Sequence, residues 1–318
     1  MAVKSVVPTL NTVASTERGP TEALWSGQGQ QGGYWIEDFL QDPRLGYHFF
    51  DDMERGAPSS ALTTTATTGS FGTWGMYAYG NATIVDGSAY GGLLRLICGT
   101  TSNQGVALTS FAGMVQLADT ASTPVPGCLV FEASIGVNYI GTAAASQADV
   151  FVGLTSKGQP AAGQPITTTA GSLYNTMDAI GFMRVGTVGN DWGFLYQKAG
   201  VAAVFPTNLQ TLVSTVTGSA IVASTQYKLG FMYNPRAQSE TISVSTTGNS
   251  TTSIGAIPMI QVFVNGIQAP AFLTRNNVGS SNFPQGFMGP AVAIMNASTA
   301  TGLTAYVDFV RLAQQGWQ

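Results

Sequence analysis

One histidine, His48, limits the acid–base chemistry available to this chain of 318 residues. A serine or cysteine nucleophile needs an imidazole or an equivalent base within hydrogen-bond reach, and a third group that orients the base. His48 lies in the run GYHFFDDMERG, and no G-x-S-x-G motif accompanies it. We therefore expect His48 to be an ordinary histidine at the surface or at a strand edge, and one histidine excludes a histidine-based zinc site.

Carboxylates offer a second chemistry, glycoside hydrolysis, which uses two acids roughly 5 to 10 Å apart. Glu132 is followed on its strand face by Ser134 and Gly136, so this strand supplies one carboxylate only. A glycosidase would need the fold to bring a second acid near Glu132. The other acids beyond the N-terminal part stand alone, and we expect them to cap turns and to bind loop backbone. They are Asp149, Asp178, Asp191, Glu240 and Asp308.

The sequence contains few residues that could bind a metal ion or take part in redox chemistry. Asp51, Asp52 and Glu54 are three acids in four positions that could collect a calcium ion, but the absence of a D-x-D-x-[DN]-G loop favours a solvated strand end. Cys98 and Cys128 are too few for a disulfide scaffold. They are expected to be buried free thiols, with a single bridge as the alternative. No phosphate-cradling or dinucleotide glycine motif is present, so the sequence predicts no enzyme, no cofactor and no metal.

Charged residues are sparse and unevenly distributed. They make up 9% of the chain, against about 25% in an average soluble protein. Residues 1–55 hold 12 of the 28 charged side chains, and the net charge is −4. The chain therefore lacks the cationic surface that nucleic-acid binding needs. Its longest strictly apolar run has five residues, whereas a membrane helix needs about 20, so no membrane partner is expected either.

The first 45 residues differ from the rest of the chain in composition and pattern. The run GQGQQGG at 27–33 is typical of a linker, and YWIEDFLQDP at 34–43 has the spacing of one short helix that ends at its proline. Aromatic and apolar residues in so short a segment cannot bury one another, and they favour a partner surface. The residues predicted to bind a partner are Trp25, Tyr34, Trp35, Ile36, Phe39 and Leu40.

From about Gly46 the hydrophobic period changes to two, which is typical of half-buried strands. No stretch beyond residue 60 sustains a helical stripe, and polar stretches at 59–70, 160–172 and 246–256 are expected to be long loops. The pattern predicts one all-β, antiparallel sandwich over residues 46–318, preceded by an extended N-terminal arm over residues 1–45. Strands are predicted within 91–99, 128–137, 148–156, 179–186, 191–198, 225–234, 240–247, 259–266 and 305–312.

The aromatic residues Trp74, Tyr77, Tyr79 and Tyr90 stand near glycines. Their spacing favours core and cross-strand packing, and stacking on sugar rings in a lectin-like groove is the alternative.

Several runs together resemble a concanavalin A-like jelly-roll sandwich of the laminin G or pentraxin type. They cover about residues 46–315 and read FFDDMERG, GGLLRLICG, CLVFEASIGV, ADVFVGLTSK, AIGFMRV, YKLGFMYNP, IQVFVNGIQ and AYVDFVRLAQQ. Lectins, glucanases and bacteriophage virion proteins share this sandwich, so the fold does not choose among them. The Gly/Gln arm, the sparse charges and the Ser/Thr/Ala-rich loops resemble those of domains on tailed-phage particles.

The resemblance implies a non-enzymatic bacteriophage structural protein, a capsid decoration, minor capsid or head-fibre protein. It would be made in the host cytoplasm and held on the capsid surface through residues 1–45. The implied partners are the major capsid protein and symmetry copies of the chain, in a homotrimer. The sequence lacks the glucanase carboxylate motif and the Asp/Asn/His cluster by which lectins of this type bind metal. A carbohydrate-binding virion or tail protein with a glycan ligand is the alternative, and a glycoside hydrolase is less favoured.

Overall fold

A computed structural model describes residues 46–53, 67–71, 74–85, 93–110, 113–117, 127–139, 148–156, 165–167, 172–186, 191–235, 242–246, 250–254, 259–297 and 302–315. The short helix expected near residue 35 lies outside these ranges, as does the whole of the predicted arm.

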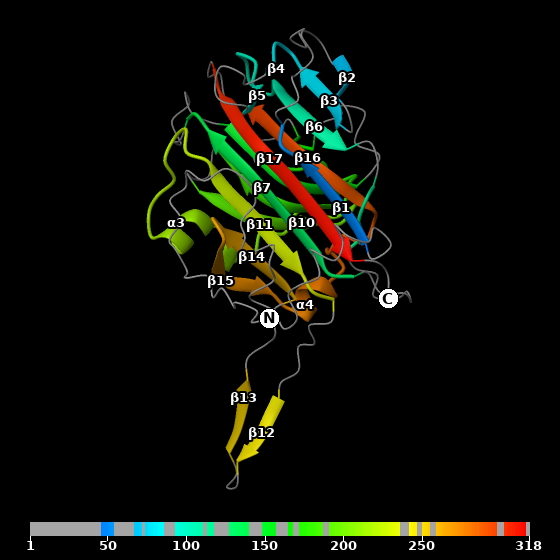
Figure 1. Cartoon of the computed structure of the whole chain (residues 1–318), viewed down its shortest axis with the longest axis vertical. Helices are drawn as coiled ribbons and strands as arrows, with labels where there is room; N and C mark the ends of the chain where they lie inside the picture. The colour runs from blue at the N-terminus through cyan, green and yellow to red at the C-terminus, as the bar shows by residue number, and fades with distance from the viewer. Residues whose placement is uncertain are drawn as a thin grey trace, which may run out of the picture.

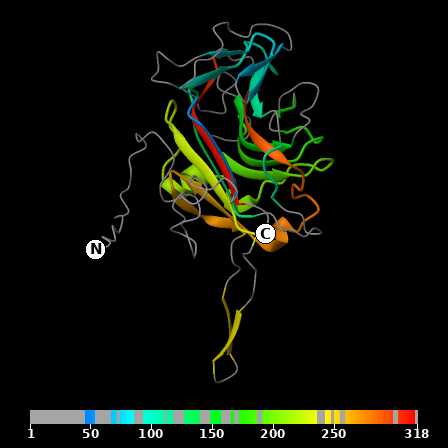
Figure 2. The same cartoon turned by 45° about the vertical axis from the view of Figure 1, so that its right-hand side comes forward.

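Two antiparallel sheets pack face to face and form a sandwich (Figure 1, Figure 2). The eight-stranded sheet has the order β15 (Ile267–Leu273), β14 (Ile260–Val264), β11 (Tyr227–Tyr233), β7 (Leu129–Val137), β17 (Thr304–Gln315), β5 (Leu94–Ile97) and β4 (Thr83–Val85), with β1 (Gly46–Asp51) also paired to β17. The seven-stranded sheet has the order β10 (Trp192–Gln197), β9 (Ala179–Arg184), β8 (Ala148–Ser156), β16 (Met288–Asn296), β6 (Gly105–Ser110), β3 (Trp74–Tyr79) and β2 (Thr67–Phe71).

The chain repeatedly crosses from one sheet to the other, as in a jelly roll. The strand β7 in one sheet is followed by β8 in the other, and β15 is followed by β16 and then by β17 across the sandwich. The last two strands of the chain therefore lie in the middle of the two sheets, β16 between β8 and β6, and β17 between β7 and β5. The antiparallel sandwich predicted from the period-two pattern is confirmed.

Alternate side chains of the facing strands build the core. Phe131 stacks on Phe231 with ring centroids 5.4 Å apart, and Phe194 meets Phe231 edge to face at 5.5 Å. Phe182 and Phe194 lie 5.3 Å apart, so rings from both sheets form one aromatic centre. Because residues two apart share a strand face, the period-two pattern predicted which side chains of β7 and β11 would enter this core.

The expectation that the strands are half-buried is wrong for several strands of each sheet, whereas β5 does alternate between buried and partly exposed residues. Every residue of β7 is buried, on its outer face as well as on its core face. On the seven-stranded sheet, Phe151, Met183 and Leu195 join a second hydrophobic cluster on the face away from the main core. Ile166 and Leu173, which pair with each other, belong to this cluster. Ile166, which lies in the polar stretch at 160–172, therefore contributes to a layer packed on the sheet.

Short helices and further strands depart from the predicted pattern. The helices α3 (Leu212–Thr217) and α4 (Arg275–Val278) and the 3₁₀ turn η4 (Thr207–Leu209) lie where no helix was expected. Two stretches expected to be loops contain β2 and one strand of a separate hairpin, β12 (Ile242–Thr246) with β13 (Ser250–Ile254). The strand β16 reads MGPAVAIMN, and it carries no alternation because both of its faces are buried. Within the described ranges, no helix has the length and apolarity needed to cross a membrane.

Candidate functional site

The single histidine lies on β1 beside an arginine of the neighbouring strand. Arg311 Nε donates a hydrogen bond to His48 Nε2 over 3.0 Å, and the β7–β17 register places Arg311 opposite Glu132. Burial, and then the Arg311 guanidinium, lower the pKa of His48. Burial also lowers the pKa of Arg311, and Glu132 opposes that shift. His48 is therefore held as a neutral imidazole whose Nε2 lone pair is already used, which does not suit it to be a general base.

Glu132 is 1% exposed, on the outer face of the eight-stranded sheet. Arg311 lies opposite it on one side and Gly230 on the other. The register therefore brings a cation, not a second carboxylate, to Glu132 from the neighbouring strands. This is the pattern of a buried charge that is compensated inside the fold.

The isolated acids of the sandwich bind loop backbone, as predicted. Asp178 Oδ1 accepts the N–H of Ala199 at 2.7 Å, and its Oδ2 accepts the N–H groups of Gln285 at 3.1 Å and Gly286 at 2.5 Å. Asp149, fully buried, accepts the N–H of Gly186 at 2.8 Å. The prediction is confirmed for these two acids, whereas Glu240 lies outside the described residues.

Asp191 caps a helix that is distant in sequence. Its carboxylate accepts the backbone N–H groups of Val213 and Ser214, both at 3.0 Å, and the hydroxyl of Ser214. These are N–H groups of the first turn of α3, which have no partner within the helix. The side chain of Thr211, at the N-cap position of α3, makes no capping bond. Asp191 thus supplies the cap from another segment, and no local signal in the sequence could have located α3.

The acids at the end of β1 have a structural role in the part that is described. Asp51 accepts the N–H of Met53 at 2.9 Å and the indole N–H of Trp74 at 2.8 Å. Glu54 lies outside the described residues. Nowhere among the described residues do three His, Cys, Asp or Glu side chains gather as metal ligands would.

Both cysteines are free thiols, as predicted, but the expectation that both are buried is wrong for Cys128. Cys98 is buried, and burial together with Asp149 raises its pKa well above the ordinary value. Cys128 is half-buried, and its Sγ lies 3.7 Å from Asn234 Oδ1. A thiol with a raised pKa is a poor nucleophile, so Cys98 acts as a small core residue.

The aromatic residues on β3 do not form a sugar-stacking face. Trp74 is fully buried and meets Phe49 edge to face at 5.6 Å. Tyr77 and Tyr79 project from the opposite face of the strand, where Tyr77 is buried and Tyr79 is 42% exposed. Core packing is confirmed for Trp74, and Tyr77 is buried in the second face of the sheet. Tyr90 lies outside the described residues.

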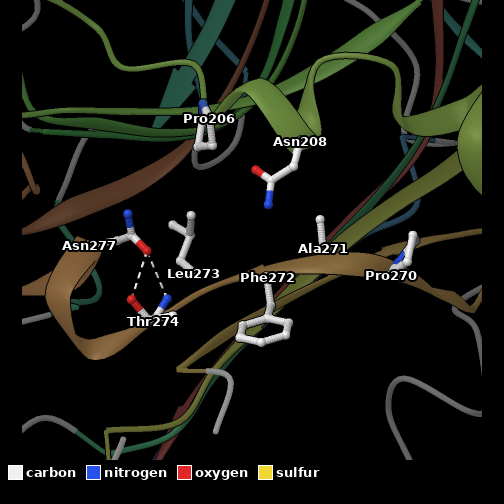
Figure 3. A pocket seen from close by; sticks show the side chains of 8 residues that line it. All are labelled: Pro206, Asn208, Pro270, Ala271, Phe272, Leu273, Thr274 and Asn277. Atoms are coloured by element: carbon white, nitrogen blue, oxygen red, sulfur yellow. Dashed lines mark hydrogen bonds between the residues drawn. The ribbon is translucent and has the colours of Figure 1, made fainter. Parts of the chain in front are cut away.

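A groove runs along the edge strand β15, and sequence reasoning did not find it. It has a volume of about 540 Å³ and no charged lining residue. Two asparagines from different elements, Asn208 of η4 and Asn277 of α4, face it (Figure 3). Asn277 Oδ1 accepts both the N–H and the hydroxyl of Thr274 at 2.9 Å, which leaves its amide NH₂ directed away from Thr274. The Phe272 ring projects to the other side of β15 from Asn208. The other lining residues are Pro206, Pro270, Ala271 and Leu273.

The groove can bind chemically neutral groups through hydrogen bonds. Asn277 is preoriented by its two bonds to Thr274, and proline at both Pro206 and Pro270 limits backbone motion of the walls. An amide such as that of Asn208 both donates and accepts, which suits a hydroxyl or a carbonyl. The residues predicted to bind a partner, Trp25 to Leu40, lie outside the described residues, so the structure brings none of them to this groove.

Comparisons with known proteins found similar solved structures, whereas no family model and no curated protein matched the chain. A protein of unknown function from Shewanella oneidensis MR-1 is 13% identical, with 85% of this chain and 87% of that chain covered and a TM-score of 0.46. Peanut lectin is 10% identical, with 85% and 97% covered and a TM-score of 0.47. A carbohydrate esterase from the Shiga toxin-encoding bacteriophage phi24B is 14% identical, with 76% and 90% covered and a TM-score of 0.35. The fold of this chain, an antiparallel β-sandwich, follows from its own strand order and register.

Proposed function

We propose that this chain is a non-enzymatic structural protein of a bacteriophage particle, held on the major capsid protein through residues 1–45. The observation that carries the proposal is the use of the acids in the sandwich. Asp178, Asp191 and Asp149 each accept backbone N–H groups of loops or of a helix, and Arg311 lies opposite Glu132. Acids used in this way hold loops in place, which suits a body that is displayed and has no product to release.

Attachment through residues 1–45 is supported by composition. Between residues 25 and 40, six aromatic or aliphatic residues flank a Gly/Gln linker. The 263 residues after position 55 hold only 16 charged side chains. An extended segment can cover a large partner surface, because its ordering cost is met on assembly. A body with few charges also lets copies lie side by side with little repulsion, which suits the homotrimer that the resemblance implies.

The arm is tested in particles assembled with altered copies of the chain. Replacing Trp25, Trp35 and Phe39 by serine in the full chain should reduce its copy number per particle at least tenfold, measured by quantitative mass spectrometry of purified particles. The matched control replaces the exposed Tyr79, Tyr139 and Phe287 of the body by serine and should leave the copy number unchanged. The proposed attachment through residues 1–45 is contradicted if the arm variant unfolds as cooperatively as the parent and is still incorporated at the parental copy number.

Carbohydrate binding is the second candidate, favoured by the groove beside β15. Its two asparagine amides and its uncharged lining match the hydroxyl groups of a neutral sugar. An open groove of this kind suits a dissociation constant near 1 mM per site, which is a binding free energy of about −4 kcal/mol. Display of many copies on a particle would strengthen the overall binding.

A glycan array tests this second candidate. Asn208→Ala should abolish any signal that the parent protein gives, because Asn208 is exposed and faces the groove. Asn276→Ala, at an exposed position on α4 outside the groove lining, is the control. No signal from the parent, or a signal that both variants keep, removes the groove as a sugar site.

A further inference from the structure

The hairpin of β12 and β13 stands apart from the sandwich. Its strands pair only with each other among the described elements, in a register that runs from Ile242 opposite Ile254 to Thr246 opposite Ser250. Figures 1 and 2 show the hairpin projecting well beyond the sandwich, at the end where β15 and α4 lie. The hairpin therefore forms no pairing with the described strands of the sandwich, and each of its two long edges is unpaired among the described elements.

A two-stranded sheet of this kind lacks the strands that would stabilise it. An isolated hairpin is marginally stable in water, and a stable sheet needs three or more strands or a packed face. Each hairpin strand here has five residues, so the pairing energy is small. The hairpin therefore gains most from another strand added at one of its edges.

The two edges differ in how they are protected against strand addition. Proteins block exposed edges with charges and prolines. In the sequence, a charged residue, Glu240, stands two residues before β12. No charged residue occurs between 241 and 274, so β13, which reads STTSI, has neither a charge within it nor one near it in sequence. The β13 edge is the one open to a partner strand.

We propose that β13 pairs antiparallel with β13 of a second copy of this chain, around a twofold axis, to form a four-stranded sheet in the order β12–β13–β13–β12. Two copies of an uncharged strand approach without electrostatic repulsion, and Ser and Thr residues form favourable cross-strand pairs. Four strands exceed the number that an independently stable sheet needs. The projection beyond the sandwich leaves room for two bodies on either side of the axis. This pairing is independent of the arm and of the proposed function.

Cysteine cross-linking tests the pairing in the full chain. Thr252 lies at the centre of β13, so a twofold axis places the two copies of this residue opposite each other. Directly opposite residues of antiparallel strands have Cα atoms about 4.5 to 5.5 Å apart, within the range that a disulfide spans. Thr252→Cys should give a covalent dimer on a non-reducing gel after mild oxidation. Ser219→Cys, exposed after α3, is the matched control and should stay a single chain.

A charge at the same position tests the pairing without covalent chemistry. Thr252→Lys places two lysines face to face and should halve the molar mass measured by light scattering, whereas Ser219→Lys should leave the mass of the parent protein. The near-UV circular dichroism of both variants reports that the sandwich remains folded. The proposal is overturned if the Thr252→Cys dimer is absent, or if Thr252→Lys keeps the parental mass. A parent that is monomeric when pure would likewise overturn it and would point to a strand from a different protein.

Discussion

Several charged side chains among the described residues bind other groups of the same chain. Asp178 connects the loop after β10 with the segment before β16, because it accepts N–H groups from both. Asp51 links the end of β1 to the buried indole of Trp74. A single carboxylate in this protein accepts several N–H groups and so fixes loops that would otherwise need several weaker contacts. Removal of such a carboxylate is therefore expected to lower the free energy of unfolding substantially.

The Asp191 cap gives a graded test of this role. Asp191→Ala should lower the free energy of unfolding by about 1–3 kcal/mol, since it leaves buried or half-buried N–H groups of α3 without an acceptor. Asp191→Asn should cost less, because the amide oxygen still accepts. Thr211→Ala is the control and should cost under about 0.5 kcal/mol, as Thr211 makes no capping bond. Urea denaturation measures all three, and equal stability of the alanine variant and the parent would contradict the assigned role.

His48 makes stability depend on pH with a defined sign. Its pKa in the folded chain lies below the ordinary value of 6.5. As pH falls below 6.5, the unfolded chain takes up a proton that the folded chain does not, so stability falls. The free energy of unfolding, measured by urea denaturation between pH 7.5 and 5.5, should therefore drop more for the parent than for His48→Gln, by less than about 1.4 kcal/mol per pH unit. A steeper fall for the variant would show that the sign is wrong.

At the scale of the elements, register explains why particular residues are small. Gly153 of β8 lies opposite Gly181 of β9. A Cβ added at Gly153 would lie 2.3 Å from the carbonyl oxygen of Ile180 and 2.6 Å from the Cα of Gly181. Both neighbours are backbone atoms, so neither can move aside without shifting a strand. The close approach of β8 and β9 thus depends on glycine.

Gly153→Ala should consequently destabilise the sandwich by about 3 kcal/mol, at the upper end of what overpacking costs. Gly193→Ala, on the adjacent strand β10, is the matched control, because its added Cβ would have no neighbour closer than 3.5 Å. Thermal unfolding followed by circular dichroism compares the two. A loss that is the same for both variants would mean that the β8–β9 approach is not the cause.

At the scale of the whole molecule, the position of the central strands at the end of the sequence means that the sandwich can be completed only late in folding. The last strands, β16 and β17, occupy the middle of the two sheets, and β17 pairs with β7, β5 and β1. The earlier strands on either side of them, β7 and β5 in one sheet and β8 and β6 in the other, therefore lack one of their two neighbours until the chain is nearly complete. Such long-range pairing is typical of slow-folding β-proteins.

A chain that ends at residue 286, and so lacks β16 and β17, is expected to remain unfolded. It should show no near-UV circular dichroism and rapid proteolysis. Replacement of residues 241–255 by a short Gly-Ser linker removes the hairpin and is the control, because the hairpin pairs with no described strand of the sandwich. Cooperative unfolding of the truncated chain would contradict this view of assembly.

The strands with clear alternation were predictable, whereas strands such as β6 and β16, and the site, were not. The alternation in Leu129–Val137 and Tyr227–Tyr233 located strands and their core faces, because the faces of a strand repeat every two residues and so are visible locally. The free thiols and the backbone-binding role of Asp178 also followed from residue type and isolation. The groove did not, since Asn208 and Asn277 come from different elements and carry no motif.

By itself, the sequence determined the all-β class, the core face of the alternating strands and the scarcity of charge. Only the tertiary structure decided that β16 and β17 lie in the centre, that Asp191 caps α3, and that Arg311 lies opposite Glu132. The reason is physical. A strand's own pattern records which of its faces is apolar, whereas its neighbour in the sheet depends on pairing between residues far apart in the chain, which no local period records.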